Sequence, residues 1–154
     1  MTEQEARKYK VGQFFTLWEF LRSTDAVRHN LTQQQLNIPD ECIENIKNLC
    51  KFVLDPLRLK YGVITINSGY RCPELNEVVG GKETSQHLKA MAADIVVQPI
   101  SKAFKHMAKE LPYDQLIDEY DFSWIHVSFN INKNRHQILR INKNGVKYLT
   151  INDL

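Results

Sequence analysis

The sequence predicts an α+β domain in which a small antiparallel sheet is backed by helices. Residues 39–60 carry apolar side chains at every third or fourth position, which is the period of an amphipathic helix. Several short segments are apolar or alternate between apolar and polar residues, as strands do. Short linkers join most of these segments, and this order favours an antiparallel sheet over a doubly wound parallel one. At 154 residues, the chain fits a single domain with its own core.

The N-terminal part is expected to hold a polar leader followed by a first short helix. Residues 1–13 are mostly polar, and we expect a flexible leader there, so that residues 14–154 make up the domain. Residues 15–23 then read as a helix. Thr16 is a suitable N-cap, and Glu19, three positions later, completes the pattern of a capping box.

Two further helices follow from apolar periodicity. The helix over 39–60 is expected to kink or break near Leu54, because Pro56 has no backbone N–H and falls inside the pattern. A second amphipathic pattern predicts a helix over 101–111.

The remaining chain reads as strands and loops. Residues 76–85 are rich in polar and glycine residues and are expected to form a loop. Asn144 and Gly145 favour a tight hairpin turn with positive φ between the last two strands. The predicted strands are 63–70, 92–98, 114–120, 123–131, 136–141 and 146–151.

Composition excludes several classes of partner. A net charge of +2 is too small to indicate binding to nucleic acid or to an anionic membrane. We also expect the protein to be a monomer. No stretch approaches the ~20 apolar residues of a membrane span, and the N-terminus lacks the apolar segment of a secretory signal. The cysteines fit neither a disulfide set nor a metal ribbon and are expected to be reduced and mostly buried: Cys42, Cys50 and Cys72.

Three side chains suggest a metal site. His87 and Asp94 lie seven positions apart in the otherwise small and apolar stretch SQHLKAMAADI, and His126 lies in an apolar strand. Each histidine alone is better explained by a hydrogen bond to a backbone carbonyl, and Asp94 alone could cap a turn. Together, two imidazoles and a carboxylate match a zinc site that keeps one position for water and could hydrolyse an amide.

The motifs around these residues resemble those of the M15 family of zinc peptidases. The pattern S-x-H-x-x-x-x-A-x-D occurs at residues 85–94, and W-x-H-V occurs at residues 124–127. The segment INSGYRCPELNEVVGG resembles the one that precedes the first ligand in that family. The segments FTLWEFLRS and DPLRLKYG resemble the leading helices of its phage-type and D-alanyl-D-alanine carboxypeptidase-like branch. The likeness covers residues 14–141, in order.

The resemblance implies a cell-wall enzyme with the hedgehog/D,D-peptidase fold. Such enzymes cut peptidoglycan stem peptides as D,D-carboxypeptidases or as L-alanyl-D-glutamate endopeptidases. It implies His87, Asp94 and His126 as zinc ligands. Arg71 is implied as a catalytic residue that contacts substrate, and its fork suits a carboxylate or a polarised carbonyl. Ser85 and Trp124 are implied as substrate-binding residues; for Arg71 the alternative is a solvated turn residue or a structural ion pair.

The chain departs from the family pattern at two positions. Some branches carry glutamate where Ser123 stands, and serine cannot take a proton from water at neutral pH. Some members have glycine in place of Ala90, a change that costs little if φ is negative there.

The catalytic base must therefore come from nearby acids. The choices are Asp114, Asp118, Glu119 and Asp121. Glu119 matches best the acidic residue that follows a QLI-like strand in the phage-type branch, and Asp118 is the second choice. Strand alternation puts the two on opposite faces but does not say which face lines the cleft. All four could also be solvated acids at an edge.

Two other functions remain open from the sequence. A catalytically inactive, zinc-stabilised binding module of the same fold would also keep the ligands without the base. A nucleic-acid module would use the basic residues of the C-terminal hairpin, which are more simply its polar rim: Lys133, Arg135, Arg140, Lys143 and Lys147. For the peptidase, we expect synthesis in the cytoplasm without a signal peptide and action on the cell wall, as for a phage endolysin or a virion-associated lysin.

Overall fold

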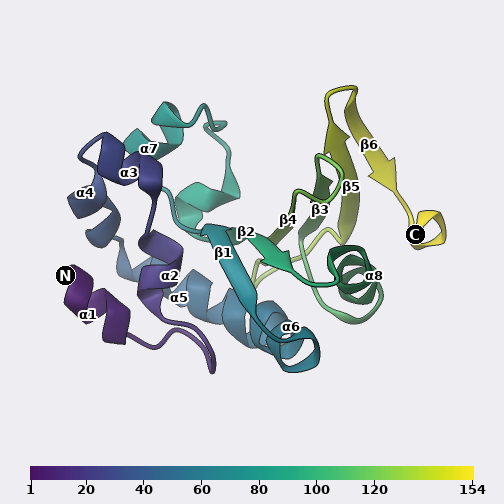
Figure 1. Ribbon diagram of the computed structural model, residues 1–154, viewed down its shortest axis with the longest axis horizontal. Coiled ribbons are helices and arrows are strands. Elements are labelled where there is room, and N and C mark those ends of the chain that lie inside the picture. Colours follow the sequence, from purple (N-terminus) through teal and green to yellow (C-terminus); the bar gives the residue numbers. More distant parts are fainter.

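The computed structural model describes residues 1–154 and shows an α+β fold built on one six-stranded mixed sheet. Helices α1 to α4 gather around the N-terminus, whereas the β5–β6 hairpin projects beside the C-terminus (Figure 1). The α-helices are α1 (Glu3–Lys8), α2 (Leu17–Leu21), α3 (Thr24–Arg28), α4 (Thr32–Leu36), α5 (Asp40–Leu49), α6 (Asp55–Tyr61), α7 (Pro73–Val78) and α8 (Ile100–Glu110). The strands are β1 (Ile64–Ser68), β2 (Ala92–Val97), β3 (Gln115–Glu119), β4 (Trp124–Ser128), β5 (Gln137–Asn142) and β6 (Gly145–Leu149).

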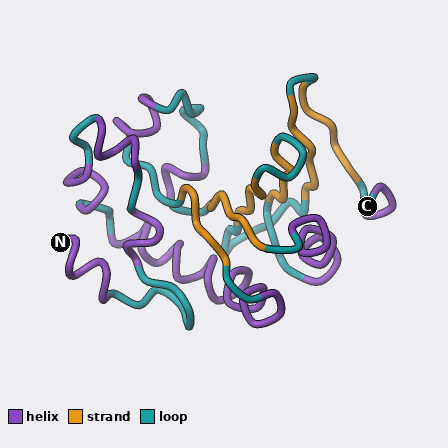
Figure 2. Tube along the Cα trace, viewed as in Figure 1, coloured by secondary structure: helices purple, strands orange, loops and turns teal.

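The sheet is mixed, which corrects the expectation of a purely antiparallel one. Its order is β1-β2-β4-β3-β5-β6, and every neighbouring pair is antiparallel except β3 and β5, which are parallel. The reason is that β2 occupies the free edge of β4. After β4, a short loop leads the chain past β3 to the far edge of that strand, where β5 runs opposite to β4 and therefore alongside β3. Figure 2 shows the strands as one band through the molecule.

The long predicted helix is interrupted where the proline requires it. It consists of α5, a π-helical segment over Cys50–Leu54, and α6, whose first turn contains Pro56. The N–H of Asp55 bonds to the carbonyl of Cys50, five residues back, so the hydrogen-bond register is shifted just before the residue that cannot donate. The helix runs without a gap from Asp40 to Tyr61, so the predicted kink or break near Leu54 occurs instead as this shift of register.

Two regions differ from the expectation of irregular structure. Residues 1–13, expected to be a flexible leader, contain α1, in which Ala6 is fully buried, and the N–H of Gln13 donates to the carboxylate of Asp55 at 2.9 Å. The predicted loop over 76–85 begins inside α7. Short helices with few apolar positions, as also in α3 and α4, are stabilised by tertiary packing, which periodicity does not register.

The two faces of the sheet have different surroundings. Ile125 and Val127 of β4 point into the core, where α8 packs against β2, β3 and β4. Alternation turns His126, between them, to the opposite face. That second face carries the polar side chains described below, so the core side supports the strands while the other side remains open.

The cysteines lie as the sequence predicts. All three cysteines are unpaired and buried, as expected. None of the helices has both the length and the apolar character needed to cross a bilayer.

Candidate metal centre

The backbone of a neighbouring segment holds the first histidine in place. His87 lies in the 3-10 helix Gln86–Lys89 and is only 3% exposed. Its Nδ1 lies 2.7 Å from the carbonyl oxygen of Gly69, which can only accept, so we assign the ring proton to Nδ1. Burial lowers the pKa of His87, and the ring is therefore neutral at pH 7 with a lone pair on Nε2.

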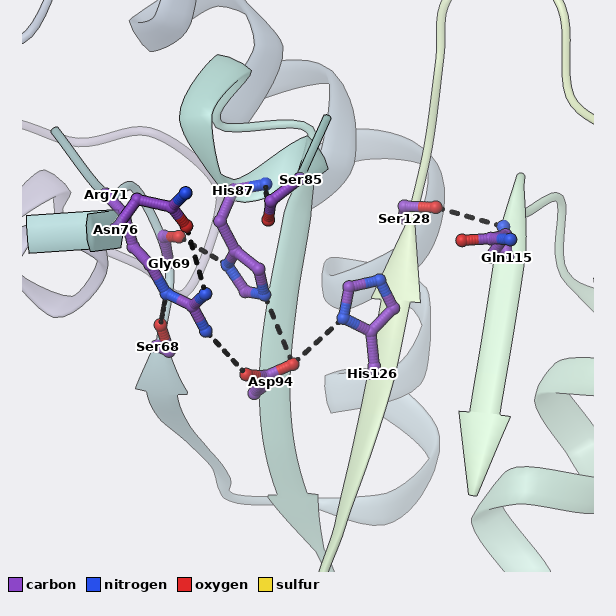
Figure 3. Close-up of polar contacts among 10 residues, drawn as sticks. All are labelled: Ser68, Gly69, Arg71, Asn76, Ser85, His87, Asp94, Gln115, His126 and Ser128. Atoms are coloured by element: carbon purple, nitrogen blue, oxygen red, sulfur yellow. Dashed lines mark hydrogen bonds and ion pairs between the residues drawn. The ribbon is translucent and has the colours of Figure 1, made fainter. Parts of the chain in front are cut away.

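Asp94 and His126 come from β2 and β4, whose antiparallel register places them directly opposite each other. The same carboxylate oxygen, Asp94 Oδ1, lies 3.0 Å from His126 Nδ1 and 3.3 Å from His87 Nε2. Figure 3 shows the three side chains converging above the sheet. One ligand atom from each lies within 4.8 Å of the others. Residues far apart in the chain thus form one cluster.

This set of donors fits a divalent metal. His87 Nε2 and Asp94 Oδ1 both present lone pairs across 3.3 Å, an arrangement that becomes favourable when a cation lies between them. Burial alone would raise the pKa of Asp94, but the hydrogen bond with His126 outweighs burial and holds the pKa below its usual range. The carboxylate is thus charged at neutral pH. Two imidazoles and one carboxylate are a ligand set of catalytic zinc sites.

Arg71 lies beside this cluster. Its Nη2 is 3.5 Å from Asp94 Oδ2, and its Nε donates to Ser68 Oγ at 3.1 Å. Asn76 Oδ1 lies 3.5 Å from Nη1 and holds the other side of the fork. Burial lowers the pKa of Arg71 and the charge of Asp94 opposes this shift, yet a guanidinium stays protonated throughout the physiological range. The structure therefore places a fixed positive charge next to the candidate metal site.

Glu119 and Asp118 lie on opposite faces of β3. The register pairs Ile117 with His126, so Glu119, two residues further on, shares the face of the metal cluster and lines the cleft. Burial raises the pKa of Glu119, as do the negative charges of Asp94 and Asp118, while His126 acts in the opposite direction. A base of raised pKa is better matched to neutral pH than an exposed glutamate.

The carboxylate of Asp118 is buried and makes structural hydrogen bonds. Asp118 is 1% exposed, and it accepts hydrogen bonds from Arg140 Nε at 2.9 Å and from the N–H of Phe122 at 2.7 Å. The other two acids do not reach the cluster either. Asp114 is paired with Arg135, and Asp121 is an exposed residue of the β3–β4 turn.

The predicted substrate-binding residues lie around the same cluster. Ser85 caps the 3-10 helix, and its Oγ accepts from the N–H of His87 at 3.3 Å. Trp124 pairs with Glu119 in the β3–β4 register. Ser123, where some family members carry glutamate, donates from its hydroxyl to the carbonyl of Tyr120 at 2.6 Å and belongs to the turn.

One cleft of about 500 Å³ contains all of the predicted site residues. They are Arg71, Ser85, His87, Asp94, Glu119, Trp124 and His126. Other residues of the cleft wall were not predicted from the sequence, namely Lys82, Gln86 and Gln115. Arg135, predicted to lie on the polar rim of the hairpin, lines the cleft instead. Gln115 lies on the same face of β3 as Glu119, and Gln86 immediately precedes His87, whereas loops bring Lys82 and Arg135 to the cleft and no local pattern marks those two.

Two backbone positions explain how the first histidine is fixed. At Gly69, a Cβ would lie 2.7 Å from the backbone of Phe20, so only glycine lets the carbonyl that binds His87 pass this close. Ala90, which follows the 3-10 helix, has φ +56°. The condition for a small cost at Ala90, a negative φ, is therefore not met, and alanine there carries a conformational cost of about 1–2 kcal/mol.

Comparison with known proteins identifies the family. A family model described as Peptidase M15 matches residues 13–128. No curated protein gives a significant match to the chain. The matched range contains His87, Asp94 and His126 as well as Arg71 and Glu119. Because the match spans well over half of the chain and contains the whole metal cluster, this protein belongs to the peptidase M15 family.

Proposed function

We propose that the protein is a zinc-dependent peptidase that hydrolyses peptidoglycan stem peptides. The observation that carries the proposal is the placement of a neutral histidine, a charged aspartate and a second histidine in a cleft that also contains Glu119 and Arg71. Peptidases of the M15 family are metal-dependent, which agrees with this arrangement. The hedgehog/D,D-peptidase type of fold, with helices behind a small sheet, belongs to the same proposal.

His87, Asp94 and His126 would hold the metal. A zinc ion bound there would lower the pKa of water toward ~7 and polarise the scissile carbonyl. Glu119 lies on the same face of the sheet and is the group that accepts the proton from the attacking water. The same carboxyl then delivers this proton to the leaving amine, and its raised pKa suits both roles.

Arg71 is proposed to stabilise the charge that develops on the scissile carbonyl oxygen. Its guanidinium is fixed by Ser68 and Asn76, so it does not need to reorganise during the reaction. Its contact with Asp94 also ties the metal ligand to the substrate-binding side of the cleft. Ser85 and Trp124 would contact the peptide on either side of the scissile bond.

The substrate class rests on the chemistry of the cleft and on the family resemblance. The wall is polar and carries several cationic side chains, as expected for a peptide that has free carboxylates. Stem peptides are of this kind, and the bond cut would be D-alanyl-D-alanine or L-alanyl-D-glutamate. An enzyme that acts on the cell wall in this way would fit the role of a phage endolysin or a virion-associated lysin.

An inactive, zinc-stabilised binding module is the alternative, because Ser123 replaces the glutamate of some branches. Glu119 favours the peptidase over the binding module, because its half-buried carboxylate of raised pKa lies in the cleft and could serve as the base.

Digestion of a defined muropeptide separates the two. We expect the zinc-supplemented protein to release products whose masses identify one cleaved amide bond. A chelator should abolish cleavage, and added zinc should restore it. Binding of zinc without cleavage of either candidate bond would reject the peptidase and favour the binding module.

A further inference from the structure

Arg135 is a cationic residue in the wall of the cleft, and it has no role in the proposed metal chemistry. It lies in the loop between β4 and β5, beyond the range that the family model matches. Its Nε and Nη2 donate to the two oxygens of Asp114 at 2.9 and 2.8 Å, and its backbone N–H donates to the same carboxylate at 2.8 Å. Asp114 itself is 4% exposed. A buried acid thus holds this arginine in one orientation.

The held guanidinium still has donors to offer. Asp114 occupies the side formed by Nε and Nη2, so Nη1 and the second N–H of Nη2 stay free at the end of the fork. The side chain of Arg135 is 48% exposed and lines the cleft. An end-on pair of N–H groups is the geometry that binds a carboxylate with two hydrogen bonds.

Gln86 supplies a second, independent sign of a ligand at this wall. Its Nε2 donates to Asp114 Oδ2 at 2.8 Å, which fixes the amide, and its Oε1 is buried without any hydrogen-bond partner. Buried polar atoms are rarely left without a partner, and an acceptor of this kind lacks an N–H donor. Gln86 lines the same cleft and immediately precedes His87.

Lys82 adds a second cationic side chain to the wall that carries Arg135. Asp114 offsets the charge of Arg135, and Asp94 and Glu119 face the metal cluster. A cationic side chain in a cleft raises the local concentration of an anion.

We propose that Arg135 and Gln86 form a carboxylate subsite that recognises an amide N–H and a carboxylate on the same α-carbon. Arg135 binds the carboxylate, and Gln86 Oε1 accepts from the N–H. Two groups of a stem peptide have this chemistry: the C-terminal D-alanine, and a D-glutamate linked through its γ-carboxyl. The naming of these peptides rests on the proposed function, but the subsite itself does not require cleavage.

The test compares each peptide with its amidated form. The first pair is acetyl-L-lysyl-D-alanyl-D-alanine and its C-terminal amide. The second pair is L-alanyl-γ-D-glutamyl-L-lysinamide and the form amidated also at the glutamate α-carboxyl. Binding is measured by titration calorimetry with zinc-supplemented protein that carries Glu119→Gln, so that cleavage is slow. We expect amidation to weaken binding about tenfold or more in one pair, which identifies the carboxylate that is recognised.

Variants assign this effect to Arg135. Arg135→Gln should bind the acid and the amide of that pair equally. Arg135→Lys keeps a charge beside Asp114 and so preserves the fold, but it should lose most of the discrimination because an ammonium has no fork. The matched control is Arg140→Gln, which removes the equivalent ion pair with the buried Asp118 outside the cleft and should leave the discrimination unchanged.

The outcomes separate this subsite from the peptidase proposal. The subsite is rejected if amidation changes neither affinity, if Arg135→Gln and Arg140→Gln reduce discrimination equally, or if no peptide binds. Discrimination that depends on Arg135, together with no cleavage when Glu119 is intact, rejects the peptidase and keeps the subsite. Cleavage without discrimination between acid and amide rejects the subsite and keeps the peptidase.

Discussion

Replacing Glu119 with glutamine is expected to lower kcat/KM for the cleaved stem peptide by about 10²- to 10⁴-fold. The amide is close in shape to the carboxylate but cannot accept a proton from water. Glu119 does not belong to the metal cluster, so zinc affinity and the melting temperature should change little. Steady-state kinetics and calorimetric zinc titration on the same preparation check both statements.

Asp118→Asn is the matched control for this variant. Asp118 is the neighbouring acid, but it faces the other side of β3 and is paired with Arg140. Its replacement should reduce stability, because it weakens a buried ion pair, while kcat/KM of the folded fraction stays near the wild-type value.

In the wild-type protein the rate of cleavage should rise with pH as Glu119 loses its proton, and Glu119→Gln should remove that dependence. Full activity of Glu119→Gln would exclude this residue as the base.

Replacing His126 with alanine is expected to weaken zinc binding by at least about 100-fold and to remove activity with it. Loss of an outer hydrogen-bond partner of a metal ligand already costs 10- to 100-fold in affinity, so loss of a ligand costs at least as much. His126 is one of only two imidazoles in the cluster, and Asp94 would be left with His87 alone. Competition with a fluorescent zinc chelator measures the affinity directly.

His106→Ala provides the comparison for the histidine variant. His106 lies on α8, outside the cleft, with its ring centroid 5.6 Å from that of Tyr61. This variant should bind zinc as the wild-type protein does. If His126→Ala and His106→Ala bind zinc equally well, the metal is bound elsewhere or nonspecifically.

Local patterns predicted most elements of the fold, because their causes are local. The period of the segment 39–60 was enough to predict a long helix. The missing N–H of Pro56 marked where its hydrogen-bond register changes, which happens in a π-helical segment and not in a break. The parallel pairing of β3 with β5 could not be read from the sequence. In the sheet, β2 pairs with the edge of β4 that β3 leaves free, so β5 pairs with β3 instead. This arrangement depends on strands that are far apart in the chain.

The candidate site shows the same division. Spacing and motif were enough to single out His87, Asp94 and His126, which the structure brings together. Alternation put Glu119 and Asp118 on opposite faces but could not choose between them, and the choice follows from the pairing of β3 with β4. The position of Arg135 in the cleft depends on a loop and on a buried acid 21 positions earlier in the chain, and no neighbouring residue in the sequence indicates this position.

Anomalous diffraction at the zinc edge, from crystals grown with zinc, tests the metal site most directly. We predict a single strong anomalous peak within bonding distance of an imidazole nitrogen of His87, a carboxylate oxygen of Asp94 and an imidazole nitrogen of His126. A peak at any other position, or no peak at this cluster at saturating zinc, would contradict the proposed site and the peptidase mechanism built on it.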